Sequence, residues 1–322
     1  MKKEDLRIVY MGTPDFAVES LRRLVEGEYN VVGVITMPDK PVGRHQTELT
    51  PSPVKKYAME KGIKVLQPAK LKDPEFISEL QSLKADLQIV VAFRMLPEVV
   101  WNMPRLGTFN LHAALLPQYR GAAPINWAII NGDTETGITT FFLDHEIDTG
   151  NIIQRVPVPI LDTDNAEDVH DKLMFLGADL VIETVDNIIA DNVHPIPQSE
   201  FQTTEALRPA PKIFKETCRI DWSRGVKPAY DFIRGLSPYP AAWTELVGNG
   251  KRQMLKIFST EKIFQSHALP TGTLVCEDKQ TLKVALHDGF LLLKEIQLAG
   301  KKRMQTTDFL RGFRVEEGMH LE

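Results

Sequence analysis

The front half of this chain alternates apolar runs with helical patterns, and this alternation constrains the fold more than any other feature. Runs typical of buried strands occupy residues 6–11, 31–35, 87–93, 108–112, 138–143 and 152–158, and a long helical pattern covers residues 164–190. Strands that are apolar throughout and separated by helices are typical of a mostly parallel sheet with helices on both faces. We therefore predict a doubly wound, Rossmann-like α/β domain over residues 1–190.

The back half has a different pattern. Residues 191–208 are polar and contain prolines, which predicts a linker. A helical pattern covers residues 226–235, and five short strand patterns follow at 242–247, 252–260, 271–276, 281–287 and 290–297. Short strands separated by Gly, Asn, Asp or Pro are typical of a small barrel. We therefore predict an OB-like β-barrel domain over residues 209–322.

Charge is distributed unevenly between the two halves. The whole chain has a net charge of −5, yet residues 205–322 carry 19 Lys and Arg against 14 Asp and Glu. Residues 1–204 carry the remaining 19 basic and 29 acidic residues. A basic back half favours a polyanionic partner such as nucleic acid, although such a split also arises by chance.

The composition also predicts a location. Two cysteines, Cys218 and Cys276, are too few for a disulfide framework and indicate free thiols in a reducing compartment. No signal peptide and no run of about 20 apolar residues is present. We expect a cytoplasmic protein with no membrane partner and no obligate protein partner, working as a monomer.

One strand ends in a pair of residues that suit acyl transfer. Asn110 and His112 lie two positions apart, so both point to the same face of the strand. An amide donor beside an imidazole can polarise a carbonyl and move a proton. Asp148, from the segment 143–150, is a carboxylate that would hold the imidazole and favour its charged form. These three candidate catalytic residues suit attack of an amine on an acyl carbon without a metal.

Two other chemistries are weaker candidates. Asp144, His145, Glu146 and Asp148 are close in sequence, but their spacing matches no standard metal-ligand pattern, so we predict no metal. The Gly12-Thr13-Pro14 turn lacks the Gly-x-Gly-x-x-Gly pattern of a dinucleotide site, which disfavours an oxidoreductase.

Basic residues supply candidates for contacts with nucleic acid. The long irregular loop predicted over residues 37–53 carries Lys40 and Arg44, although an ordinary surface loop would look the same. The back-half candidates for phosphate contact are Lys212, Lys215, Lys251, Arg252, Lys301, Lys302 and Arg303. The segments 220–222 and 237–243 contain Trp and Tyr, and we expect both to be packing segments.

Taken together, several motifs resemble the methionyl-tRNA formyltransferase family, nearly from end to end. The motifs are residues 7–17, 38–44, 51–55, Asn110-Leu111-His112, Leu115-Leu116-Pro117, residues 120–124, Asp148-Thr149-Gly150, Lys215-Glu216 and Ile220-Asp221-Trp222. The strand-end motifs alone resemble all enzymes that use 10-formyltetrahydrofolate. The loop at 37–53 and the complete back half are similar to the tRNA enzymes in particular.

This resemblance implies the substrates and further site residues. It implies 10-formyltetrahydrofolate as formyl donor, methionine on initiator tRNA as acceptor, and catalytic roles for Asn110, His112 and Asp148. The residues that it implies for folate binding are Ala114, Leu115, Leu116, Pro117, Phe93, Arg94, Met95 and Leu96. It also implies that Arg44 approaches the acceptor end of the tRNA. Ala114 replaces the usual Ser of the family, and the turn at 93–97 replaces a longer stretch containing Tyr-Gly.

Two alternatives remain open from the sequence. The first is a related N-formyltransferase that acts on a small amine, such as a sugar nucleotide or glycinamide ribonucleotide. The second is an RNA-binding factor without transferase activity, whose α/β half merely binds a metabolite. Within the first, the loop at 37–53 and the basic back half disfavour a glycinamide ribonucleotide formyltransferase, and the residues Asn110, His112 and Asp148 disfavour the second.

Overall fold

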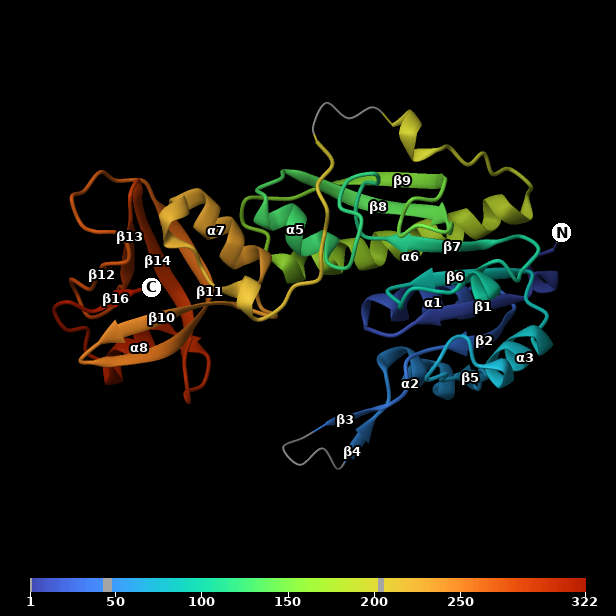
Figure 1. Ribbon diagram of the computed structural model, residues 1–322, viewed down its shortest axis with the longest axis horizontal. Helices are drawn as coiled ribbons and strands as arrows, with labels where there is room; N and C mark the ends of the chain where they lie inside the picture. Colours follow the sequence, from blue (N-terminus) through green and yellow to red (C-terminus); the bar gives the residue numbers. More distant parts are fainter. Residues whose placement is uncertain (1, 43–47, 202–205) are drawn as a thin grey trace. The chain divides into compact units, whose positions relative to one another are not determined.

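The computed structural model describes residues 2–42, 48–201 and 206–322, and the chain forms two compact units (Figure 1). The first unit consists of residues 1–121, 136–158 and 170–209, and the second of residues 122–135, 159–169 and 210–322. The predicted domain boundaries at 190 and 209 stay a prediction. In the structure, the chain crosses between the units several times rather than once.

A seven-stranded sheet forms the centre of the first unit. Its strand order is β5-β2-β1-β6-β7-β8-β9. The strands are β1 (Ile8–Gly12), β2 (Val31–Ile35), β5 (Val65–Leu66), β6 (Leu87–Val91), β7 (Thr108–His112), β8 (Glu135–Phe142) and β9 (Ile152–Pro159). The pairs from β5 to β7 are parallel, whereas β8 runs antiparallel to β7. The predicted parallel α/β sheet is therefore confirmed, with an antiparallel addition at one edge.

Helices cover both faces of this sheet. The helices of the unit are η1 (Lys3–Asp5), α1 (Phe16–Glu26), α2 (Pro53–Glu60), α3 (Pro74–Ser82), α4 (Glu98–Trp101), the larger part of α6 (Ala166–Ile189) and η2 (Gln198–Glu200). Val9 and Met11 of β1 pack in one apolar cluster with Phe76 of α3. The ring of Tyr10 points to the opposite face, where its hydroxyl donates to Ala17 O of α1 at 2.5 Å. This alternation along β1 is what a doubly wound sheet requires.

The segment predicted as an irregular loop contains a small hairpin. Strands β3 (Lys40–Val42) and β4 (Glu48–Thr50) pair antiparallel, so the loop prediction for 37–53 is wrong at both of its arms. Asp39, at the base of this hairpin, accepts hydrogen bonds from Lys55 Nζ at 2.6 Å and from Gln67 Nε2 at 2.7 Å. These donors lower the pKa of Asp39, the Lys55 hydrogen bond most of all. The base of the hairpin is therefore fixed to α2 and to the segment after β5.

Residues 191–201 and 206–209 pack on the first unit. Ile196 pairs with Ile152 of β9 through two backbone hydrogen bonds. Arg208 O accepts from Tyr119 N at 2.8 Å, and Arg208 N donates to Gln118 Oε1 at the same distance. The backbone polar groups of this segment are thereby satisfied by the sheet edge and by the 118–119 turn, which explains why so polar a sequence can lie against the unit.

The second unit contains the predicted barrel. Its strands are β10 (Ala242–Gly248), β11 (Lys251–Ile263), β12 (Leu274–Val275), β13 (Lys283–Leu286), β14 (Gly289–Leu298), β15 (Met304–Gln305) and β16 (His320–Leu321). They run antiparallel in the order β12-β13-β14-β11-β10-β16, and β15 joins β14. A bridge between Thr273 and His320 connects the two ends of this order. The prediction of a small β-barrel is confirmed.

Helices and packing segments complete the second unit. Its helices are α5 (Pro124–Ile130), η3 (Glu216–Cys218), η4 (Trp222–Arg224), α7 (Val226–Gly235) and α8 (Thr306–Gly312). Ile220 and Trp222 lie in the barrel core, so the packing role predicted for 220–222 is confirmed. The same prediction for 237–243 is wrong at Tyr239, whose side chain is 84% exposed.

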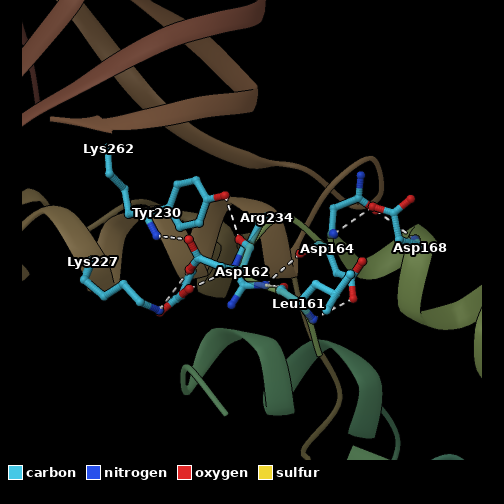
Figure 2. Close-up of polar contacts among 10 residues, drawn as sticks. Leu161, Asp162, Asp164, Asp168, Lys227, Tyr230, Arg234 and Lys262 are labelled. Carbon is cyan, nitrogen blue, oxygen red and sulfur yellow. Dashed lines mark hydrogen bonds and ion pairs between the residues drawn. The ribbon is translucent and has the colours of Figure 1, made fainter. Parts of the chain in front are cut away.

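A charged cluster joins α7 to the segment before α6 (Figure 2). Arg234 Nε donates to Asp231 Oδ1 at 2.8 Å, and Arg234 Nη1 donates to the carbonyl oxygens of Leu161 and Asp164 at 3.1 and 2.7 Å. Both Asp231 and Arg234 are buried. Each charge therefore has several polar partners, which is what burial of an ion pair demands.

Candidate active site

The site is built at the carboxyl end of β7, beside the point where the sheet changes from parallel to antiparallel pairing. Asn110 and His112 lie on one face of β7, between β6 and β8. His112 is buried, whereas Asn110 is half-buried. No side-chain hydrogen bond joins Asn110 to any other residue within the described ranges. Its amide is therefore available to a ligand at this edge, the place where open α/β sheets bind ligands.

The two ring nitrogens of His112 have different surroundings. Nε2 lies 2.8 Å from Tyr119 O, and Nδ1 lies 3.9 Å from Asp148 Oδ2. A carbonyl oxygen only accepts, so Nε2 carries a hydrogen in this arrangement. Nδ1 is then the nitrogen that can gain or lose a proton, and it is the one that faces the carboxylate.

Asp148 is held in place by backbone groups. Its Oδ2 accepts a hydrogen bond from Gly121 N at 2.9 Å, and its own backbone has φ of 55°. Asp tolerates this left-handed conformation better than most side chains. The fold thus brings together all three catalytic candidates. The separation of 3.9 Å between His112 Nδ1 and Asp148 Oδ2 is too long for a hydrogen bond.

Gln198 is a residue of this site that the sequence reasoning missed. Its side-chain amide donates to Asp148 O at 2.8 Å and to Gly150 O at 2.9 Å. Its Oε1 accepts from Arg120 Nε and Nη2 at 3.1 and 2.6 Å. Gln198 therefore ties the 148–150 turn to the loop after β7. No local signal marks it, because it lies in a polar, Pro-bearing segment.

The loop after β7 is fixed largely through its own backbone. Ala114 O accepts from the Thr139 hydroxyl at 2.6 Å, and Leu116 O accepts from Arg155 Nη1 at 2.7 Å. The Leu116–Pro117 peptide bond is cis. Ala114, Leu116 and Pro117 are buried and Leu115 is half-buried. Of the four predicted folate contacts here, Leu115 offers the most accessible side chain.

The turn at 93–97 divides its side chains between the core and the surface. Arg94 donates to Ala69 O at 2.9 Å and also to Pro68 O, and burial lowers the pKa of its guanidinium. Leu96 packs in the cluster beneath α3, and Phe93 packs against the same cluster. Met95 is 68% exposed. Within this turn, Met95 is the side chain best placed to meet a ligand.

The predicted tRNA-contact residues lie in both units. Lys40 is exposed at the start of β3, and Arg44 falls outside the residues that the structure describes. Lys212, Lys215, Lys301 and Lys302 are exposed, with the Lys212 ammonium 5.5 Å from the centre of the Phe214 ring. Arg303 pairs with Glu295 at 2.6 Å. The four lysines thus offer positive charge to a partner more readily than Arg303 does.

The described residues contain neither a group of side chains arranged as metal ligands nor a helix suited to span a membrane. Within residues 2–42, 48–201 and 206–322, no three His, Cys, Asp or Glu side chains are arranged to hold a metal ion. In the same ranges, no helix is both long enough and apolar enough to span a bilayer.

Known proteins share both halves of this chain. Residues 6–185 match the family described as formyl transferase, and residues 212–314 match the formyl transferase C-terminal domain. A methionyl-tRNA formyltransferase of Bacteroides thetaiotaomicron is 69% identical over 320 residues, covering 99% of each chain. One from Phocaeicola vulgatus is 71% identical over 325 residues, covering 100% of each chain.

A solved structure has the same fold at lower identity. The N-formyltransferase of Helicobacter canadensis, in complex with folinic acid and dTDP-3-aminofucose, gives a TM-score of 0.65 at 20% identity. The match covers 93% of this chain and 100% of that one. With both family regions matched and two relatives similar over their full length, the chain belongs to the formyl transferase family, among the methionyl-tRNA formyltransferases.

Proposed function

We propose that this protein transfers a formyl group from 10-formyltetrahydrofolate to the α-amine of methionine on initiator tRNA. The observation that supports this most strongly is the convergence of Asn110, His112 and Asp148 at the end of β7, with Asp148 Oδ2 3.9 Å from His112 Nδ1. The similarity over the full chain to methionyl-tRNA formyltransferases supports the choice of acceptor.

The reaction begins when the neutral amine attacks the formyl carbon. A bond forms between the amine nitrogen and this carbon, and the carbonyl electron pair moves to oxygen. The Asn110 amide, which has no partner among the described side chains, donates a hydrogen bond to the developing oxyanion. One such donor lowers the barrier by about 3–4 kcal/mol. The bond from carbon to N10 of the folate then breaks.

His112 and Asp148 handle the proton. The amine loses one proton when it is acylated, and N10 gains one when it leaves, so no net proton is consumed. His112 Nδ1 accepts the proton from the amine and gives it to N10 as the bond from carbon to N10 breaks, and the carboxylate of Asp148 stabilises the imidazolium between these two steps. His112 Nε2 stays hydrogen-bonded to Tyr119 O, which keeps the ring in one orientation throughout.

The two substrates bind different parts of the chain in this proposal. The folate lies against the Ala114–Pro117 loop and the turn at 93–97, where Leu115 and Met95 are the accessible side chains. The tRNA backbone is held by the hairpin that carries Lys40 and by Lys212, Lys215, Lys301, Lys302 and Arg303. The chain acts as a monomer in the cytoplasm.

The test is formyl transfer to three acceptors measured in parallel. They are methionyl initiator tRNA, methionyl elongator tRNA and glycinamide ribonucleotide, each with 10-formyltetrahydrofolate. Transfer confined to the initiator is the expected result. Transfer only to the small amine would replace the tRNA proposal with small-amine formylation, and tRNA binding without any transfer would leave an RNA-binding factor.

A further inference from the structure

Tyr239 of the second unit has an unusually exposed aromatic side chain. Its side chain is 84% exposed, more than any other exposed large apolar side chain among the described residues. No hydrogen bond, ion pair or ring contact joins it to another residue of the described ranges. Buried aromatic rings stabilise a core, whereas an exposed ring without a partner contributes little to the fold and is free to contact something outside the chain.

The turn that carries Tyr239 is firmly held at both ends. Leu236, Ser237 and Ala241 are buried, and Ala241 N donates to Leu236 O at 2.9 Å. Ser237 N bonds Arg234 O at 3.3 Å, and the Arg234 side chain belongs to the cluster in Figure 2. The ring therefore sits on a preorganised tip, which reduces the entropy lost when it binds a partner.

A second exposed ring lies on a neighbouring segment. Phe214 is 56% exposed, and the Lys212 ammonium lies 5.5 Å from the centre of its ring. The Trp243 indole donates to Lys215 O at 2.7 Å, and Trp243 O accepts from Ile220 N. Trp243 thus fastens the segment that carries Phe214 to the start of β10, directly after the Tyr239 turn.

The two segments combine flat rings with positive charge. Lys212 and Lys215 are exposed beside Phe214, whereas Arg219, whose guanidinium lies 5.5 Å from the Trp243 indole centre, is paired with Glu245. Exposed aromatic rings bind the faces of unpaired bases, while nearby cations bind the phosphates. Paired bases in a duplex do not present their faces, so this combination fits single-stranded nucleotides better than a helix.

We propose that Tyr239 and Phe214 form a stacking platform for unpaired bases of the tRNA. This inference rests on the proposed function and adds residues that recognise the form of the RNA rather than its charge. Tyr239 supplies a ring on a firmly held turn for one base, and Phe214 supplies a second ring beside the lysines. The platform contributes to tRNA binding and takes no part in the transfer of the formyl group.

The test measures binding of deacylated initiator tRNA to the full chain and to single variants. We expect Tyr239→Ala to raise the Kd about 10- to 100-fold, because loss of one stacked base has an effect of this size. Tyr239→Phe keeps the ring and should stay within about 2-fold. Phe264→Ala, which removes another exposed ring of the same unit, is the matched control and should bind like the original chain.

Three further measurements separate stacking from other causes. The dependence of Kd on salt should have the same slope in Tyr239→Ala as in the original chain, because no charge is removed. Binding of a fully paired RNA duplex should be equal in both. Formylation at saturating tRNA should also keep its kcat.

Several results would overturn the platform. They are an unchanged Kd in Tyr239→Ala, an equal loss in Tyr239→Phe, and an equal loss of duplex binding. If the unsubstituted chain neither binds nor formylates initiator tRNA, the proposed function fails as well. If that chain binds and the variants bind equally well, only the platform fails.

Discussion

Two carboxylates of this molecule lie beside a basic side chain, and they do so in opposite ways. Asp231 bonds Arg234 at 2.8 Å and also pairs with Lys227. Asp148 lies 3.9 Å from His112 Nδ1 and takes its hydrogen bond from Gly121 N instead. Asp231 therefore pairs with two basic side chains, whereas Asp148 and His112 lie too far apart for a hydrogen bond between them.

This difference is the one expected between a structural pair and the pair that we propose to be catalytic. A buried charge that only supports the fold is most stable when every partner position is filled. A group that must bind a changing charge during a reaction needs a position held by other means and a partner free to move. The Gly121 amide holds the Asp148 carboxylate and the Gln198 side chain holds the Asp148 carbonyl, so the position of Asp148 does not depend on His112.

Removal of Asp231 is expected to have the largest effect on stability. Asp231→Ala leaves Arg234 buried without its carboxylate, which should lower the free energy of unfolding by about 3–5 kcal/mol. Denaturant unfolding followed by fluorescence measures this loss, and kcat per folded molecule should stay near that of the original chain. Replacing both residues, as Asp231→Leu with Arg234→Met, should recover part of the stability. A loss below about 1 kcal/mol would show that this buried ion pair contributes little to the stability of the fold.

The opposite outcome is expected at the end of β7. Asn110→Ala and Asp148→Asn should each lower kcat at least about 100-fold, because a donor to the oxyanion or the charge facing His112 is lost. Single-turnover formylation checks this, and unfolding curves should move little. Near-normal turnover in either variant would remove that residue from the mechanism.

The sequence predicts the strand that carries the candidate site better than it predicts the contacts that support this site. Strand alternation alone puts Asn110 and His112 on one face, and the bounds of β7 agree with the predicted residues 108–112. Apolar periodicity likewise places α7 at 226–235. These features depend on neighbours in the sequence, so a local pattern is enough to predict them.

The parts that could not be predicted depend on distant contacts. Gln198 reaches the 148–150 turn from a segment whose composition indicates a linker, and Arg234 bonds the carbonyl oxygens of Leu161 and Asp164 in the segment before α6. The hairpin within 37–53 escapes prediction because its arms are only three residues each and one contains a proline. The prediction for Tyr239 is wrong for a different reason. Its aromatic ring is expected to pack, but it is exposed.

Gln198 is expected to act on the proposed catalytic pair indirectly, because it positions Asp148 without touching the reacting atoms. Gln198→Ala should lower kcat about 10-fold, since the 148–150 turn loses two hydrogen bonds from the side chain, while KM for tRNA stays unchanged. Gln154→Ala is the matched control, because Gln154 bonds Glu183 away from the site and should keep its kcat. An equal fall in both variants, or a rise in KM alone, would argue against a positioning role.

The smallest expected effect concerns the exposed rim of the structural cluster. The Lys262 hydrogen bond, opposed by partial burial, lowers the pKa of Asp162. A carboxylate with a lowered pKa stabilises the fold at pH values above its unfolded pKa of about 4, and this contribution is lost as the pH falls through the folded pKa below that value. Because its side chain is 60% exposed, Asp162→Asn should cost at most about 1 kcal/mol at pH 7.

That small cost should disappear in acid, whereas the effect of Asp231→Ala at neutral pH should stay several times larger. Urea unfolding of the original chain and of Asp162→Asn, measured from about pH 7 down to about pH 3, tests this. The two midpoints should converge towards the acid end, since the protonated carboxyl of Asp162 and the amide that replaces it are both uncharged. A constant difference across this range would mean that Asp162 acts through packing, and the contrast between a saturated interior pair and a weak rim pair would then lose its electrostatic basis.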